Sequence, residues 1–276
     1  MSATKVEKWA PGMKPAASGL ITVDGVRLYC RIDGHAKSPH LMLSNSIGTD
    51  HSTWSEQVNI LKKHFRVVSY DTRGHGASDA GDKDYGIERL GRDALGLLDA
   101  LGIARAHFCG LSLGGMTGMW LGIHAPKRID RLVLANTAAH IGPPEMWTTR
   151  AATVRKDGMQ AIVEGVLKRW LTARCLAENP MVVEKARRML LAVPPEGYAR
   201  ACMMLSAMDQ RETVSRIAAP TLVIAGLQDA ATPPADAQVL VERIRGARLV
   251  ELDAAHLSNL ELPQPFTAAV EAFLKP

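Results

Sequence analysis

The feature that most constrains the fold is a Gly-Leu-Ser-Leu-Gly segment at residues 110–114. The preceding run at 105–109 is typical of a short buried strand, and residues 113–124 have the composition of a helix. Glycines two residues on either side of Ser112 allow a sharp strand-to-helix turn that larger side chains would obstruct. Such a turn exposes the Ser112 hydroxyl and points the Leu113 N–H at the place where an oxyanion would form. A glycine-rich turn that merely lets a helix cross a strand closely would look similar, so the rest of the chain must decide.

Strand-like and helix-like runs alternate along the chain. The Asp-Gly pair at 24–25 separates two strand-like runs and predicts a β-hairpin. Further strands are predicted at 41–43, 67–70, 131–135, 221–225 and 248–252, and helices at 53–63, 87–101, 234–243 and 263–274. This alternation predicts an α/β fold with a mostly parallel, doubly wound sheet of about eight strands.

The alternation stops between residues 141 and 212. This segment has no convincing strand and several helix-like stretches separated by prolines, which indicates an inserted helical cap. The core is therefore predicted at 19–140 and 213–276, and residues 1–18 are predicted to be a loosely held extension. The cap contains seven of the twelve methionines, which could line a pocket or simply fill the core of the cap.

Composition bounds the class of protein. With 276 residues and 47% hydrophobic content, one domain with an insertion is expected. The net charge of +5 is scattered without a basic run, so a nucleic-acid partner is not expected. The sequence shows neither an apolar run of membrane-spanning length nor a signal core, so a cytoplasmic protein without membrane attachment is expected.

The four cysteines lack C-x-x-C spacing, which predicts reduced thiols rather than a zinc site or a disulfide framework. The sequence leaves open whether the protein is a monomer or a homodimer.

A serine hydroxyl becomes a useful nucleophile only when a histidine can take its proton and a carboxylate orients that histidine. Asp229 and His256 follow two predicted strands at their carboxyl ends, as Ser112 does, and those ends share one edge of a parallel sheet. The chain order is then Ser-Asp-His. His75 is a rival base and Asp253 a rival acid, while the remaining histidines are expected to be packed or solvated.

A second oxyanion donor is expected in the loop at 44–48, where the Ile47 N–H is the candidate. The residues of this loop are also common in ordinary turns, so the assignment depends on the other candidates.

These motifs together resemble those of the α/β-hydrolases, and more narrowly those of the 3-oxoadipate enol-lactonases of bacterial aromatic degradation. The resemblance runs from about residue 20 to the C-terminus. The general matches are at 71–78, 110–114 and 220–229, and the narrower ones are at 45–48, Trp54, 169–170, 197–198, 229–234 and 255–259. Many enzymes of this fold carry His-Gly in the first loop, where this chain has Asn45-Ser46.

The resemblance implies an α/β-hydrolase fold and a carboxylic-ester hydrolase that opens 3-oxoadipate enol-lactone to 3-oxoadipate in protocatechuate and catechol catabolism. It implies no metal and no organic cofactor. Ser112 would attack the lactone carbonyl, His256 would carry the proton, and the amides of Leu113 and Ile47 would hold the oxyanion. A general carboxylesterase or lactonase, a carbon-carbon bond hydrolase, a cofactor-free haloperoxidase and a non-catalytic receptor remain alternatives, because a fold does not determine a function.

The lactone substrate carries a free carboxylate, which an arginine of the cap could bind through two parallel hydrogen bonds. The cap segment has eleven Lys+Arg and eight Asp+Glu, a net charge of +3. Arg150 lies one helical turn after Trp147, so the two side chains are predicted to share a face and to contact the substrate. The alternative is that Arg150 is a solvated surface residue.

Overall fold

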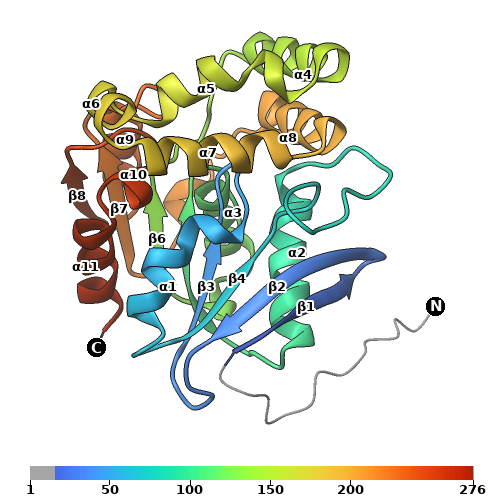
Figure 1. Cartoon of the computed structure of the whole chain (residues 1–276). Helices are drawn as coiled ribbons and strands as arrows, with labels where there is room; N and C mark the ends of the chain where they lie inside the picture. The colour runs from blue at the N-terminus through green and yellow to red at the C-terminus, as the bar shows by residue number, and fades with distance from the viewer. Residues whose placement is uncertain (1–15, 276) are drawn as a thin grey trace.

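The structure is a computed structural model, and it describes residues 16–275 (Figure 1). Its eight strands form one sheet in the order β1-β2-β4-β3-β5-β6-β7-β8. The first two pairings, β1 with β2 and β2 with β4, are antiparallel, and all others are parallel. The prediction of a mostly parallel sheet of about eight strands is confirmed. The strands are β1 (Ala16–Val23), β2 (Val26–Asp33), β3 (His40–Ser44), β4 (Arg66–Tyr70), β5 (Ala106–Leu111), β6 (Ile129–Ala135), β7 (Thr221–Gly226) and β8 (Arg248–Leu252).

The predicted hairpin is present at the start of the sheet. Asp24 and Gly25 both have positive φ, 45° and 80°, as the turn between two antiparallel strands requires. Strand β1 begins at Ala16, three residues before the predicted start of the core, so the assignment of residues 16–18 to a loose extension is wrong. The reason is that β2 continues to Asp33 and gives these residues backbone partners. The rest of the predicted extension, residues 1–15, lies outside the described residues.

Helices cover both faces of the sheet. Figure 1 shows α1 and α11 in front of the sheet and α2 and α3 behind it. Helices α3, α9 and α11 have the predicted bounds, whereas the short α10 was not predicted. The core helices are α1 (Ser55–Leu61), α2 (Ile87–Ala100), α3 (Leu113–His124), α9 (Pro234–Arg243), α10 (Ser258–Glu261) and α11 (Pro263–Leu274).

The segment predicted as a helical cap contains five α-helices. They are α4 (Pro144–Asp157), α5 (Val163–Trp170), α6 (Ala173–Glu178), α7 (Pro180–Ala192) and α8 (Pro195–Ala207). These helices gather beyond the end of the sheet toward which β3, β6 and β8 point (Figure 1). An isolated β-bridge joins His140 to Asp209, so the chain leaves the core and returns to it at neighbouring positions.

The sequence raised two further questions, whether a helix could span a membrane and whether the cysteines are paired. None of the helices in the range 16–275 combines the length and the apolar character needed to cross a bilayer. All four cysteines are buried and unpaired, as predicted. Burial raises the pKa of the Cys30 and Cys202 thiols to about 12, so both stay protonated at neutral pH.

Helix α3 packs closely on the sheet through a glycine face. A methyl group added at Gly114 would collide with the backbone of Ser44, and one at Gly118 would crowd Phe108 and Leu132. The recurring glycines of this helix, each of which weakens an isolated helix by about 1 kcal/mol relative to alanine, are therefore explained by the short distance between helix and sheet.

We expect Gly114→Ala to destabilise the protein by about 1–3 kcal/mol, because the neighbouring atoms are backbone and cannot move aside easily. Gly165→Ala in α5 is the matched control. No atom lies within 4 Å of the added methyl group there, so this change should stabilise the helix by up to about 1 kcal/mol. Urea unfolding of both variants measures the difference. Equal effects of the two substitutions would contradict the close packing of α3.

Candidate active site

Ser112 lies on the sharp turn between β5 and α3. Its backbone has φ 55° and ψ −113°, a region that non-glycine residues rarely occupy. The turn is held by hydrogen bonds from the Ser112 N–H to the Ala135 carbonyl (2.9 Å) and from the Thr137 hydroxyl to the Ser112 carbonyl (2.7 Å). A methyl group at Gly110 would collide with the backbone of Gly114, which explains why glycine occupies this position.

Two backbone amides near Ser112 are available as donors. Neither the Leu113 N–H nor the Ile47 N–H donates to another protein group among the described residues. The Gly114 N–H donates to the Asn45 carbonyl at 2.9 Å, so the loop after β3 is fixed against the start of α3. This contact brings the loop with the Ile47 amide beside the serine turn, which is the arrangement that an oxyanion hole requires.

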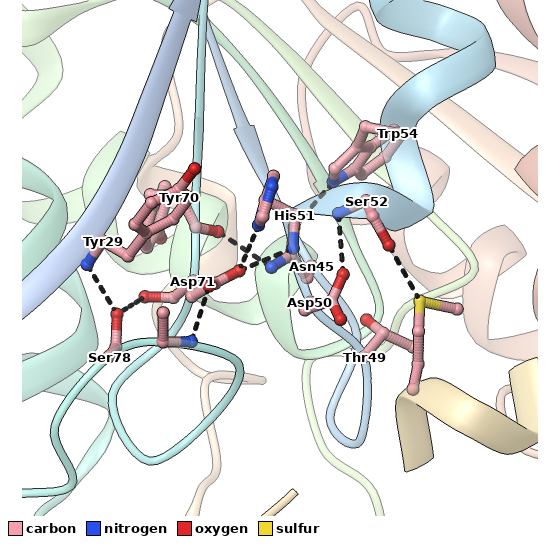
Figure 2. A network of polar contacts seen from close by, with 12 residues as sticks. Tyr29, Asn45, Thr49, Asp50, His51, Ser52, Trp54, Tyr70, Asp71 and Ser78 are labelled. Carbon is pink, nitrogen blue, oxygen red and sulfur yellow. Dashed lines mark hydrogen bonds and ion pairs between the residues drawn. The ribbon is translucent and has the colours of Figure 1, made fainter. Parts of the chain in front are cut away.

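The side chain of Asn45 anchors the loop after β3 (Figure 2). Its Nδ2 donates to the Tyr70 carbonyl at the end of β4, and its Oδ1 accepts from the Trp54 indole N–H, both at 2.8 Å. Asn45 and Trp54 are fully buried. A buried amide whose donor and acceptor are both satisfied is a rigid support, so Asn45 holds this loop in a fixed position.

Asp71 is the centre of a second polar network, which ties the loop after β4 to the short 3-10 helix His51–Trp54 that precedes α1 (Figure 2). Its carboxylate accepts from the backbone amides of His51 (2.7 Å) and Ala77 (2.9 Å) and contacts His51 Nδ1 at 2.9 Å. Burial alone would lower the pKa of His51, but the hydrogen bond and the charge of Asp71 outweigh it and raise this pKa. Asp50, His51 and Asp71 are close enough to hold a metal ion, but Asp71 already accepts these protein donors, so we assign the cluster a structural role.

The structure places Asp229 and His256 in direct contact. Asp229 follows β7, His256 follows β8, and His256 Nδ1 lies 2.8 Å from Asp229 Oδ2. Both side chains are buried. His256 also lines the same cavity as Ser112, although the hydrogen bonds of the described residues do not include one between these two side chains. Catalytic hydrogen bonds are often long before a substrate is bound.

The Asp229 carboxylate is held in its charged form. Burial would raise its pKa, but the charge of His256 and hydrogen bonds from His256, Thr232 and Asn136 lower it to about 2. Besides His256, the carboxylate accepts from the amides of Ala231 and Thr232, from the Thr232 hydroxyl and from Asn136 Nδ2, at 2.8–3.0 Å. Asp229 is therefore suited to orient an imidazole and to stabilise its positive form.

The rival candidates lie elsewhere. Asp253 is exposed and accepts a hydrogen bond from Gln228 at 2.7 Å. His75 is fully buried, contacts the Arg73 carbonyl and does not line the cavity of Ser112. His140 also lines this cavity, because its bridge to Asp209 holds it where the cap joins the core.

Ser112 and His256 face a cavity of about 540 Å³ between the core and the cap. Trp147 and Trp170 contribute apolar walls from the cap, and Ile47 and Met116 contribute walls from the core. Met146 is the one cap methionine of the predicted seven that lines the cavity. Most of the others are buried in the cap itself, which agrees with their interpretation as core residues.

Positive charge is concentrated on the cap side of the cavity. Arg150 and Arg169 both line it and form no ion pair within the described part of the chain. The guanidinium of Arg150 lies 4.7 Å from the ring centroid of Trp147. The fully buried Tyr198 hydroxyl has no hydrogen-bond partner among the described residues and stays protonated, because burial raises its pKa. One carboxylate, that of Asp236 in α9, also lines the cavity.

The sequence did not single out Arg169, Thr232 or Asn136 as residues of the site. Arg169 was only part of a matching motif, although its position just before Trp170 could have identified it. Thr232 lies three residues after Asp229, a spacing at which a residue can donate hydrogen bonds to the aspartate carboxylate within one turn. Asn136 gave no sequence signal, because its role depends on β6 lying between β5 and β7.

Comparisons with known proteins agree with this architecture. A family model described as the alpha/beta hydrolase fold matches residues 39–263. The chain is 44% identical over 255 residues to 3-oxoadipate enol-lactonase 2 of Acinetobacter baylyi, covering 92% of this chain and 96% of that protein. It is 40% identical to 3-oxoadipate enol-lactonase 1 of the same organism, covering 91% and 94%. The crystal structure of an enol-lactonase from Burkholderia xenovorans superimposes with a TM-score of 0.91 at 48% identity, covering 93% of this chain and 99% of that one.

Asp229→Asn should lower the rate of ester hydrolysis by about 10⁴-fold, because an amide favours the wrong imidazole tautomer. Asp253→Asn is the matched control and should leave the rate within a few-fold of the wild-type value, because Asp253 contacts Gln228 and not His256. Steady-state kinetics with an aryl ester measure both. A larger loss in the Asp253 variant would make that residue the acid.

Ser112→Ala should remove nearly all turnover and leave the fold intact, because nucleophile and base act as one unit. Circular dichroism and residual activity together provide the test. A folded variant that keeps substantial activity would contradict the role of Ser112.

Proposed function

The chain belongs to the α/β-hydrolase fold family, and on that premise we propose that it hydrolyses 3-oxoadipate enol-lactone to 3-oxoadipate with Ser112, His256 and Asp229 as its catalytic triad. The observation that carries the proposal is that His256, which contacts Asp229 at 2.8 Å, lines the same cavity as Ser112. The similarity to proteins named enol-lactonases supports the choice of substrate.

In the proposed reaction Ser112 attacks the lactone carbonyl while His256 takes the hydroxyl proton. The negative oxygen of the tetrahedral intermediate is stabilised by the amides of Leu113 and Ile47. Collapse of the intermediate breaks the ring C–O bond, and the leaving oxygen takes the proton from His256. The resulting enol stays attached through the acyl chain and tautomerises to the ketone. A water molecule then gives a proton to His256 and attacks the acyl-enzyme, and His256 returns this proton to Ser112 as the ester bond to the serine breaks. One lactone and one water thus give one molecule of 3-oxoadipate.

The enol leaving group explains how this site can work without a strong general acid. An enolate is a better leaving group than a simple alkoxide, and its conversion to a ketone makes ring opening hard to reverse. The proposed steps use protein groups alone, with no metal or organic cofactor. We place the reaction in the cytoplasmic breakdown of protocatechuate and catechol, which is the pathway implied by the sequence resemblance.

The cap would provide substrate recognition in this proposal. The lactone carries a carboxylate arm, and a carboxylate that enters an apolar cavity must replace the hydrogen bonds it had with water. Arg150 is the proposed ligand, since it faces the cavity without a carboxylate partner and its guanidinium packs on Trp147. Arg169 and the unpaired Tyr198 hydroxyl are further donors on the same side of the cavity.

The direct experiment follows the loss of ultraviolet absorbance of the enol-lactone with purified protein. We expect rapid loss with the wild type and none above background with Ser112→Ala. A simple aryl ester provides the comparison. Turnover of the ester without turnover of the lactone would reject the proposed substrate and favour a general carboxylesterase, and no turnover of either would favour a binding protein.

Arg150→Ala should lower kcat/KM on the acid lactone. The loss should correspond to about 1–3 kcal/mol of transition-state stabilisation, which is the value of a buried hydrogen bond to a charged group. The methyl ester of the same lactone should lose much less, because it has no negative charge for Arg150 to bind. Arg155→Ala is the matched control, since Arg155 lies on the same helix and pairs with Glu196 in solvent. Equal losses on both substrates would rule out Arg150 as the carboxylate ligand.

A further inference from the structure

Glu261, at the end of α10, contacts two segments that belong to different parts of the molecule. Its Oε1 accepts a hydrogen bond from the backbone amide of Ala255 at 2.8 Å. Its Oε2 accepts from the amide and the hydroxyl of Thr172, at 3.0 and 2.6 Å. Ala255 directly precedes His256, whereas Thr172 lies in the cap between α5 and α6. One carboxylate therefore joins the histidine loop to the cap.

A second connection runs parallel to the first. The amide of Leu257, the residue after His256, donates to the carbonyl of Trp170 at 2.9 Å. Trp170 ends α5, and its side chain lines the cavity of Ser112. His256 is thus flanked on both sides by backbone amides that are fixed to the cap segment 170–172, one of them directly and the other through Glu261.

This attachment matters because Asp229 holds only the Nδ1 side of the imidazole. The position of the opposite ring nitrogen, which must reach the Ser112 hydroxyl, depends on the backbone of the histidine loop. The Ala255 carbonyl accepts a hydrogen bond from Asn136 at 3.1 Å, so the core holds the carbonyl of Ala255 and Glu261 holds its amide. Errors of about 1 Å in the position of a catalytic group can reduce rates by about 10²-fold.

We propose that Glu261 is a positioning residue that sets the place of His256 by tying the histidine loop to the cap. The inference rests on one part of the proposed function, the catalytic triad, and not on the identity of the substrate. Any ester attacked by Ser112 would need the same histidine position. Glu261 does not line the cavity of Ser112, so its effect must pass through His256 rather than through contact with the substrate.

The main variant is Glu261→Gln, which has nearly the same shape. A glutamine keeps one carbonyl oxygen, so it can accept from Ala255 or from Thr172, and its NH₂ group then faces a donor. We expect kcat to fall about 10–100-fold on both the enol-lactone and p-nitrophenyl acetate, with KM changed by less than about two-fold. Glu251→Gln, on the exposed side of β8, is the control and should keep the wild-type kcat.

A second set of variants tests the link to the cap. Thr172→Val removes the hydroxyl that bonds Glu261 and also caps α6, whereas Thr172→Ser keeps both contacts. Asn179→Ala removes only the N-cap of α7 and controls for a weakened cap helix. Thr172→Val should lower kcat about 10-fold on both substrates, and Thr172→Ser and Asn179→Ala should retain the wild-type value.

Unfolding midpoints of all variants are measured with the kinetics, to separate positioning from general loss of structure. A folded Glu261→Gln with unchanged kcat would overturn the inference, as would equal loss of kcat in Thr172→Val and Asn179→Ala. Failure of the proposed substrate gives a different result, because wild-type protein would then hydrolyse only p-nitrophenyl acetate. The same ranking of variants on that ester would still support the role of Glu261.

Discussion

The close approach of β5, the start of α3 and the loop after β3 is the contact on which the proposed site depends. It requires the absence of a side chain at Gly110 and at Gly114, where a methyl group would collide with backbone atoms. The approach lets the Gly114 amide bond the Asn45 carbonyl, and this bond brings the Ile47 amide to the serine turn. The strained backbone of Ser112 persists because the end of β6 and the loop that follows it hold both of its peptide groups. The position of the proposed nucleophile and that of the proposed oxyanion donors thus have a common physical origin.

Buried charges in the core have protein partners, whereas the two cap arginines that line the cavity have no carboxylate partner within residues 16–275. Asp229 is buried, and the donors around it offset the cost of burial and keep it ionised. The buried carboxylate of Asp93 in the core also has protein partners, Arg73 at 2.6 Å and Arg89 at 3.1 Å. The cap instead turns Arg150 and Arg169 toward the cavity without carboxylate partners. A fixed charge beside His256 suits proton transfer. Cations of the cap that have no carboxylate partner among the described residues suit an anionic substrate, and the proposed function needs both.

The sequence predicted most elements because their signals are local. Glycine and aspartate at a tight turn, and apolar residues at strand or helix spacing, act over a few neighbours. The order of the strands had no such signal, since β4 lies between β2 and β3 only through long-range pairing. The start of β1 was misplaced for the same reason, because Ala16 becomes a strand residue by pairing with Asp33 and not through its own preference. The short α10, which carries Glu261, was too brief to show periodicity.

The sequence by itself determined the serine turn, the α/β alternation, the helical insertion and a chain order compatible with Ser112, Asp229 and His256. It left Asp253 and His75 as rivals, and it could not show that Arg169 and His140 would reach the cavity. Only the tertiary structure decided which carboxylate touches His256, and only it joined Asn136 and Glu261 to the histidine loop. Turns and periodicity depend on adjacent residues, whereas contacts between loops depend on which strands are neighbours and on how the cap folds back over their ends.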